Sequence, residues 1–439
     1  MRLLWQTFRE RLLSGFSWNL LSTAALQGSV LLSTVVVARL LPLESFGAYA
    51  VLVTTAMTTA AIAQGGAGIF ATKFVGERAS QPEQVARILK LCAAIALATG
   101  LIATLILLLG ASTLASLVLG NPALETPARL VALAVVFQVS VAYRHGALQG
   151  LGAFRQISMA GAAAGAGHLI FISVGAWKGA LEGALIGFVA ASAFRALCFH
   201  LALSRVRREH HIPSGVTIDP ADYRLIWSFA LPASLAGYVT MPCLWLVTVF
   251  VTRLPDGLSM VALFSVAHQI RMAILQLPAL LNGVAFAILS RMQGQKEGED
   301  FRQVFWTNIV INLCFTLSVV GLLMLAAPQV LALYGSEFTP GAALLMVLLA
   351  SVIPEVLGMN LYQLVQTTGR MWRSLALLVV PRDLMYLFVA VAFLPRYGVM
   401  GAAIAYLLAQ TVGLLLTALI GRGALRASSG ALATTSERT

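Results

Sequence analysis

Three polar residues in the apolar stretch 260–290 have types and spacing that suit ligand binding. His268, Arg271 and Asn282 fall within an arc of about 80° if the stretch is a helix that advances 100° per residue. A guanidinium group offers a fork of N–H donors that matches phosphate or carboxylate oxygens. Ionisable groups at membrane depth cost several kcal/mol and mark functional positions by default. The shared face is therefore predicted to line protein or water and to bind an anion.

Further polar residues occupy comparable depths in other apolar stretches. The full set of candidate substrate-binding residues is Arg271, Arg382, Arg144, His268, Asn282, Glu355, Gln366 and Asn19. The alternative for Arg271 and Arg382 is a structural ion pair with Glu355 or Asp383. Arg144 could instead extend to the cytoplasmic interface, and Arg195 is interpreted in that way.

The amino-acid composition indicates that these residues belong to an integral membrane protein. The chain has 439 residues, of which 59% are hydrophobic and 10% charged, and its mean hydropathy is +0.87. Soluble domains carry about a quarter charged residues, so a soluble enzyme, a disordered chain and a secreted disulfide scaffold are excluded. The four cysteines lie in apolar stretches without C-x-x-C spacing, which argues against disulfides and zinc. No metal and no cofactor are predicted.

Twelve apolar segments are long enough to cross about 30 Å of hydrocarbon as helices. They cover residues 16–41, 46–70, 88–110, 127–149, 156–177, 180–203, 226–252, 260–290, 304–328, 340–366, 374–395 and 397–422.

Basic residues set the predicted orientation. With both termini in the cytoplasm, the cytoplasmic segments hold 21 of the 29 lysines and arginines and the outer segments hold five. This bias follows the positive-inside rule over all eleven loops. The net charge of +12 is thus a property of the cytoplasmic face, and no nucleic-acid partner is predicted.

Similar local patterns recur along the chain. Arg39 and Arg253, Lys73 and Arg291, Gln149 and Gln366, and Gly183 and Gly401 are separated by 214 to 218 residues. Six spans per repeat give two copies of the same orientation, related by an axis along the membrane normal. The predicted fold is an all-α integral membrane protein of 12 transmembrane helices, in two six-helix bundles related by a pseudo-twofold axis, with a central cavity.

The domain organisation follows from this duplication. We expect an interfacial N-terminal helix at 1–15, an N-lobe at 16–203 and a cytoplasmic linker at 204–225. A C-lobe at 226–422 and a cytoplasmic tail at 423–439 complete the chain. Glycines four residues apart, including Gly146 and Gly150, are interpreted as sites of close helix packing.

Missing motifs restrict the energy source and the chemistry. The sequence contains no G-x-x-x-x-G-K-[ST] loop and no H-E-x-x-H, so transport is expected to use an ion gradient or the substrate's own gradient. No loop is long enough for the catalytic domain typical of membrane glycosyltransferases. An exporter of cationic drugs would need buried carboxylates in the first spans, and the first acidic residue after residue 10 is Glu44, in a loop.

The first loop carries a recognisable pattern. The segment Ala38-Arg39-Leu-Leu-Pro42-Leu-Glu44-Ser-Phe46-Gly47-Ala-Tyr49 resembles the first-loop signature of bacterial polysaccharide-export and O-antigen flippases of the Wzx type. Two further segments are similar to sequence patterns of that family, Gln149-x-x-Gly152 and Tyr397-Gly-Val-Met-Gly401. The likeness covers essentially the whole chain. Ala63-Gln64-Gly65-Gly66 departs from it, because family members often carry an acidic residue there.

The resemblance implies translocation of an undecaprenyl-pyrophosphate-linked oligosaccharide across the bacterial inner membrane, with Arg271, Arg382 and Arg144 as pyrophosphate-binding candidates. Its implied partners are the lipid-linked glycan, the phospholipid bilayer and polysaccharide polymerase or assembly proteins. The alternatives are an ion-coupled multidrug or metabolite antiporter, a membrane glycosyltransferase or ligase, and an assembly scaffold.

Overall fold

A computed structural model describes residues 26–217, 237–295, 298–367 and 375–436. Nine helices of this described part are long and apolar enough to cross a membrane. One of them is two helices joined by a kink, and two shorter apolar helices, Leu26–Leu40 and Gly237–Thr252, add to the set. If the two arms of the kinked helix are counted separately, the described residues contain twelve apolar helices. They match the twelve predicted spans in order along the chain.

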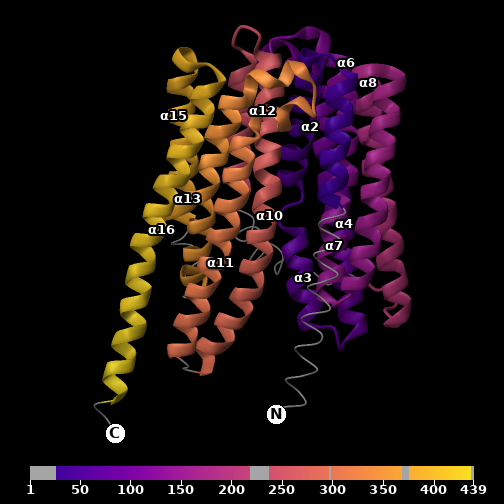
Figure 1. Cartoon of the computed structure of the whole chain (residues 1–439). Coiled ribbons are helices and arrows are strands. Elements are labelled where there is room, and N and C mark those ends of the chain that lie inside the picture. Colours follow the sequence, from indigo (N-terminus) through magenta and orange to yellow (C-terminus); the bar gives the residue numbers. More distant parts are fainter. Residues whose placement is uncertain (1–25, 218–236, 296–297, 368–374, 437–439) are drawn as a thin grey trace. The chain divides into compact units, whose positions relative to one another are not determined.

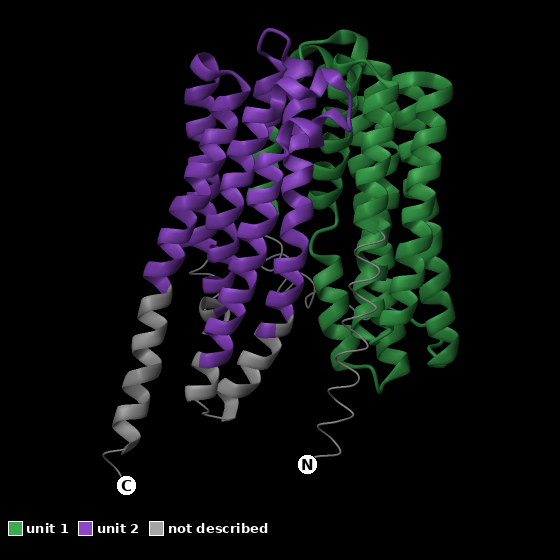
Figure 2. Cartoon of the chain, in the orientation of Figure 1, with its two compact units in different colours: residues 1–245 green, residues 246–439 purple. Residues whose placement is uncertain are grey.

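The chain divides into two compact units, residues 1–245 and 246–439 (Figure 2). Within each unit the long helices run side by side (Figure 1). The division falls inside the helix Gly237–Thr252, whereas the predicted linker covers 204–225. Residues 218–225 of that linker and the predicted helix at 1–15 lie outside the described residues, so the predicted domain limits stay a prediction.

Unit 1 begins with the helix Leu26–Leu40, and a short connection leads to α2. Its further elements are α2 (Leu43–Ala63), α3 (Ala67–Glu77), α4 (Pro82–Leu109), α5 (Ala111–Thr113), η1 (Leu114–Val118), η2 (Pro122–Leu124), α6 (Glu125–Ala132), α7 (Ala134–Gly150) and α8 (Phe154–Glu209). Glu44 in the first turn of α2 and Pro82 at the start of α4 are typical residues of helix N-termini.

In the part that the structure describes, unit 2 contains five long helices and three short elements. They are α10 (Gly257–Gln295), α11 (Gly298–Leu325), α12 (Ala327–Ala332), η3 (Ser336–Gly341), α13 (Ala342–Thr367), η4 (Leu375–Val379), α15 (Val380–Tyr397) and α16 (Val399–Ser436), after the end of the helix Gly237–Thr252. α13 packs along α16, α15 also packs along α16, and α10 contacts both α11 and α13.

The long helix α8 is a hairpin. Its backbone leaves helical geometry at Gly179 and Ala180, where Ala180 has φ 47°. Beyond the turn the chain runs back along itself, because a Cβ atom on Gly183 would lie 2.1 Å from the carbonyl oxygen of Gly175. The separate spans predicted at 156–177 and 180–203 are therefore confirmed.

The predicted continuous helix over 46–70 is wrong. α2 ends at Ala63 and α3 begins at Ala67. Gly65 and Gly66 between them have φ values of 57° and 72°, in the left-handed region that glycine enters without steric cost. The two adjacent glycines therefore break the helix that the sequence predicts as continuous.

Candidate functional site

The most deeply buried charge of the described residues is Arg271 on α10. Its side chain is 1% exposed and forms an ion pair with Glu355 on α13, whose side chain is 17% exposed. The guanidinium carbon also lies 4.3 Å from the ring centroid of Tyr406 on α16, a cation–π distance. Of the two interpretations left open for Arg271, the structure shows the interhelical ion pair. Whether Arg271 also binds substrate stays a prediction.

His268 lies one turn before Arg271 and contacts it, as their shared face predicts. Nε2 of His268 is 3.0 Å from Nη2 of Arg271. The imidazole stacks on Phe264, with ring centroids 5.9 Å apart, and meets the edge of Tyr406 at 6.3 Å. His268, Arg271, Glu355 and Tyr406 thus form one buried cluster from three helices.

Arg382 on α15 is also paired. Its Nε donates to Oδ1 of Asp383 at 2.7 Å, which is the second structural pair that the sequence left open.

Asn282 belongs to a separate cluster of carboxamides. Its Oδ1 accepts from Asn308 at 2.8 Å, from Asn312 at 3.2 Å and from Gln363 at 2.6 Å. Asn360 completes the cluster by accepting from Asn308 and Asn312 at 2.9 and 3.1 Å. These amides come from α10, α11 and α13 and bind mainly to one another.

Three predicted residues lie elsewhere. Arg144 on α7 donates to the Ser140 side chain at 2.7 Å and lies 5.1 Å from the Tyr143 ring centroid. Asn19 lies outside the described residues. Gln366 is in α13, but its side chain lies outside the described part.

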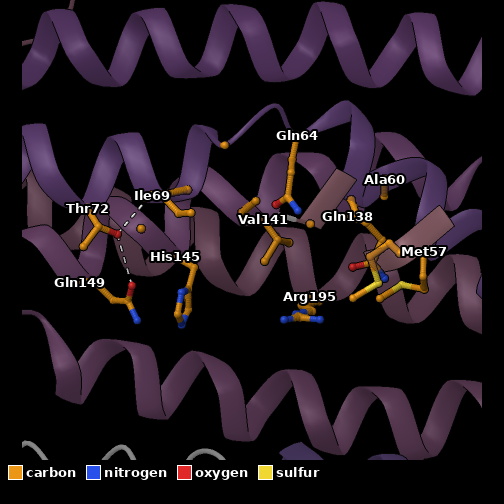
Figure 3. A pocket seen from close by; sticks show the side chains of 17 residues that line it. Met57, Ala60, Gln64, Ile69, Thr72, Gln138, Val141, His145, Gln149 and Arg195 are labelled. Atoms are coloured by element: carbon orange, nitrogen blue, oxygen red, sulfur yellow. Dashed lines mark hydrogen bonds between the residues drawn. The ribbon is translucent and has the colours of Figure 1, made fainter. Parts of the chain in front are cut away.

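The described residues of unit 1 line an open cavity of about 560 Å³ that the sequence did not indicate (Figure 3). α2, α3, α7, the second arm of α8 and the start of the helix Gly237–Thr252 contribute to it. Its lining residues are Met57, Ala60, Ala61, Gln64, Gly66, Gly68, Ile69, Thr72, Gln138, Val141, Ala142, His145, Gly146, Gln149, Arg195, Gly237 and Met241. This described lining contains one arginine, one histidine and three glutamines, and no carboxylate.

The helix break between α2 and α3 forms part of this lining. The structure gives no acceptor, in its described part, for the backbone N–H groups of Gly66, Gly68 and Ile69. These groups belong to the turn and first residues of α3, and all three residues line the cavity. The N-terminus of a helix favours negative charge through its free N–H groups and its dipole. The broken helix therefore presents donors for an anion.

Arg195 from the second arm of α8 lines the same cavity (Figure 3). None of the described acidic groups pairs with it, and its buried Nε has no hydrogen-bond partner there. Its guanidinium carbon lies 6.0 Å from the ring centroid of Phe199, and that ring is 5.6 Å from His145. Arg195 therefore lines this cavity, and its extension to the membrane interface stays a prediction.

Amide and hydroxyl groups supply the other polar contacts of the cavity. Thr72 lies 3.3 Å from Oε1 of Gln149 (Figure 3). Gln138 donates to the hydroxyl of Ser192 at 3.0 Å. Gln64 lies in the helix break, and none of the described residues forms a hydrogen bond with its side-chain amide. Groups of this type bind the hydroxyls of sugars, and the free cation beside them suits a phosphate or another acid.

Comparison with known proteins identifies the family. The profile of a family described as "Polysaccharide biosynthesis protein" matches residues 12–293, which is well over half of the chain. The chain belongs to this family. The resemblance found in the first loop is thus confirmed.

Two curated relatives of this polysaccharide biosynthesis protein carry the same description, EPS I polysaccharide export inner membrane protein EpsE. The one from Ralstonia nicotianae is 26% identical over 400 residues, covering 88% of this chain and 87% of the relative. The one from Ralstonia solanacearum is 29% identical over 200 residues, 45% of each chain.

Solved structures agree on the fold. An inward-facing multidrug resistance MATE family transporter of the MOP superfamily matches 93% of this polysaccharide biosynthesis protein and 96% of its own chain, with a TM-score of 0.81 at 19% identity. A MOP superfamily transporter from Pyrococcus furiosus, described as having a binding pocket of reversed polarity, gives a TM-score of 0.69 at 18% identity over 95% of this chain and 96% of its own. The chain therefore has the same fold as these transporters.

Proposed function

We propose that the protein is a flippase that moves a lipid-linked oligosaccharide, carried on undecaprenyl pyrophosphate, from the cytoplasmic to the periplasmic leaflet by alternating access. The family, the name of the Ralstonia relatives and the transporter fold support this proposal. The observation that carries it is the unit 1 cavity, which combines an unpaired arginine, free helix N–H groups and several amides.

The cavity suits a polar headgroup with an acidic part. Arg195 and the first N–H groups of α3 are the donors for pyrophosphate oxygens, and Gln64, Gln138 and Gln149 are the partners for sugar hydroxyls. Arg195 comes first among the arginines because it needs no rearrangement. Arg271 and Arg382 would have to exchange a carboxylate for phosphate before they could bind it.

A multidrug antiporter would need a different set of side chains in this cavity. A cationic drug needs carboxylates or a rich aromatic lining, and the described lining contains neither. We retain an antiporter of anionic metabolites as the second candidate, because an unpaired arginine suits any small acid.

Location and assembly belong to the same proposal. We place the protein in the bacterial inner membrane with both termini in the cytoplasm, on the basis of the basic residues and the name of the relatives. Polysaccharide polymerase or assembly proteins are its proposed partners.

Arg195→Ala tests the proposal in a strain that lacks the protein and has lost its surface polysaccharide. We expect membrane levels of the variant to be normal, surface polysaccharide to be lost, and the lipid-linked intermediate to accumulate unflipped. Arg205→Ala on the same arm of α8 is the matched control, because Arg205 is exposed and pairs only with Glu209. Full restoration of surface polysaccharide by Arg195→Ala would remove this cavity from the mechanism.

The same strain separates the rival classes. A scaffold would tolerate Arg195→Ala without loss of export. A glycosyltransferase or ligase would leave a shortened lipid-linked species when the protein is deleted, whereas a flippase leaves the finished intermediate. An anion antiporter would leave surface polysaccharide intact on deletion.

A further inference from the structure

The helix α7 and the second arm of α8 run side by side along the unit 1 cavity in a common register. Gln138 of α7 donates to Ser192 of α8, and two turns further on the ring of His145 lies 5.6 Å from that of Phe199. Both pairs are 54 residues apart in sequence, so the two helices advance together in the same direction. Arg195 lies between Ser192 and Phe199 on its helix, and Figure 3 shows it between His145 and Gln138 along the lining.

The hydroxyl of Ser192 fixes the polarity of the Gln138 amide. This hydroxyl has one hydrogen, which it donates to the carbonyl of Phe188 at 2.8 Å in its own helix. Its oxygen is therefore left to accept, and the amide atom that contacts it at 3.0 Å must be the donor Nε2. The amide oxygen Oε1 is then turned away from Ser192, and none of the described residues donates to it. Gln138 thus offers the cavity a hydrogen-bond acceptor.

The opposite end of the cavity offers donors. The start of α3 lies there, because a Cβ atom on Gly146, the residue after His145, would be 2.1 Å from the carbonyl oxygen of Gly68. The first N–H groups of α3 favour negative charge, as does the imidazole of His145 when it donates. The donors and the fixed acceptor therefore lie at different ends of one cavity.

Arg195 faces an apolar part of α7. Val141 and Ala142 line the cavity at its level, and neither has a polar side chain. The buried Nε of Arg195 has no hydrogen-bond partner among the described residues. The ring of Phe199, 6.0 Å from the guanidinium carbon, supports the cation without neutralising it. The charge of Arg195 is therefore available to a ligand.

We propose that this arrangement sets the orientation of the ligand, with Gln138 as the residue that selects for a sugar. The acidic group binds between Arg195 and the start of α3. Gln138 accepts a hydrogen bond from a neutral donor beside the acid, a hydroxyl or an amide N–H of the first sugar. The inference rests on the flippase proposal and adds to it the order of the two ligand parts along the cavity.

The fixed polarity also selects against other anions. An acid oxygen placed at Gln138 would meet the lone pairs of a second acceptor, so a small ligand with acidic groups at both ends is disfavoured. Ser192 does not line the cavity and acts only through Gln138. It is therefore a positioning residue.

A bond that only joined α7 to α8 would not need this arrangement. Serine, threonine and amide side chains commonly bond across membrane helices, and a short side chain is enough for that. Gln138 reaches Ser192 with one end of its amide and still lines the cavity. An amide oxygen without a partner costs free energy, which a donor on the ligand would recover.

Synthetic probes with the same tail and charge measure the contribution of the sugar. They are farnesyl pyrophosphates capped with a methyl group, with N-acetylglucosamine or with galactose. Calorimetric titration of the full-length wild type in detergent should show tighter binding of a glycosylated probe than of the methyl-capped one. Gln138→Met should reduce this preference about 3–10-fold and bind the methyl-capped probe as the wild type does. Arg195→Ala should weaken both kinds of probe by the same factor.

Ser192→Ala tests the positioning role. Without the hydroxyl the Gln138 amide can turn, so the preference for a glycosylated probe should fall about 2–5-fold while the affinity for the methyl-capped probe stays the same. Thr99→Val on α4 is the matched control. It removes a part-buried hydroxyl that, among the described residues, bonds only the Ile95 carbonyl of its own helix, and it should change neither affinity.

Either of two results would overturn the inference: a wild type that prefers neither sugar to the methyl group, or a Gln138→Met variant that keeps the wild-type preference. Both leave the flippase proposal standing, because Arg195→Ala tests that proposal through export. A wild type that binds none of the probes would exclude the cavity as the headgroup site, and the role of Gln138 with it.

Discussion

Gly146 of α7 lies directly against the backbone of Gly68 of α3. A Cβ atom on Gly146 would be 2.1 Å from the Gly68 carbonyl oxygen and 2.8 Å from its carbonyl carbon. Both atoms belong to backbone, which cannot rotate away as a side chain can. The contact therefore requires glycine at residue 146, and it holds together two helices that line the unit 1 cavity.

Gly146→Ala should destabilise unit 1 by about 1–3 kcal/mol, the usual cost of overpacking a tight contact. Thermal unfolding of the purified protein in detergent measures the loss. Gly321→Ala is the control, because Gly321 lies inside α11 with no atom within 4 Å of its added Cβ. That variant should be neutral or gain about 0.5–1 kcal/mol from helix propensity. Equal melting temperatures for the two variants would contradict the close contact.

Gly65 has a different reason to be glycine. Its φ of 57° is left-handed, while a Cβ atom there would meet only ordinary contacts, the nearest 3.6 Å away at the Tyr238 hydroxyl. Gly65→Ala should cost about 1–2 kcal/mol through backbone strain. Gly65→Asn should cost less, because asparagine tolerates this region better. Unfolding measurements that rank alanine above asparagine in stability would show that the helix break does not persist in solution.

Removal of Arg271 should be more damaging than removal of the whole ion pair. Arg271→Ala leaves Glu355 in a buried site without its cation, which costs about 3–5 kcal/mol. The double variant Arg271→Met with Glu355→Leu removes both charges and should recover most of that stability. Thermal unfolding of both variants in detergent measures the difference, and equal stability of the two would contradict the role given to the ion pair.

The sequence was sufficient for the spans but not for the breaks within them. Length and apolarity locate a helix in a membrane, because the hydrocarbon thickness fixes both. The turn at Gly179 and Ala180 was also predictable, since two spans of sufficient length meet there. Gln64-Gly65-Gly66 was missed as a break, because glycine inside an apolar run is also common in continuous membrane helices. The two glycines in succession were the available signal.

The site was predictable only where contacts are local. His268 and Arg271 are three residues apart, so helix geometry alone places them together. The partner of Arg271 required the packing of α10 on α13, and the sequence therefore favoured a cavity role while leaving the ion pair as the alternative. Arg195 was assigned to the interface because its depth does not reveal its neighbours. The position of Arg195 in the cavity depends on the hairpin of α8 and on the break between α2 and α3. The periodicity of apolar residues in the sequence indicates neither feature.

The carboxamide cluster of unit 2 should be a structural core of that unit. Asn360 is fully buried and accepts hydrogen bonds from both Asn308 and Asn312, while its own Nδ2 donates to the carbonyl of Val356 at 2.8 Å. Asn360→Leu keeps the approximate volume but removes this acceptor. Asn312 still donates to Asn282 and Asn308, whereas Asn308 keeps only Asn282 and loses the partner of its second N–H. An unsatisfied buried donor costs about 1–3 kcal/mol, so we expect a loss of stability of that size.

Thermal unfolding of Asn360→Leu, compared with Ser318→Ala on α11, measures this effect. Ser318 is exposed and bonds only the Cys314 carbonyl of its own helix, so its variant should unfold within about 0.5 kcal/mol of the wild type. If Asn360→Leu is as stable as that control, the cluster is not a core, and its amides would be free to bind a ligand. If it is destabilised as expected, the amides of Asn282, Asn308 and Asn312 serve one another, and the polar groups available to a sugar are those of the unit 1 cavity.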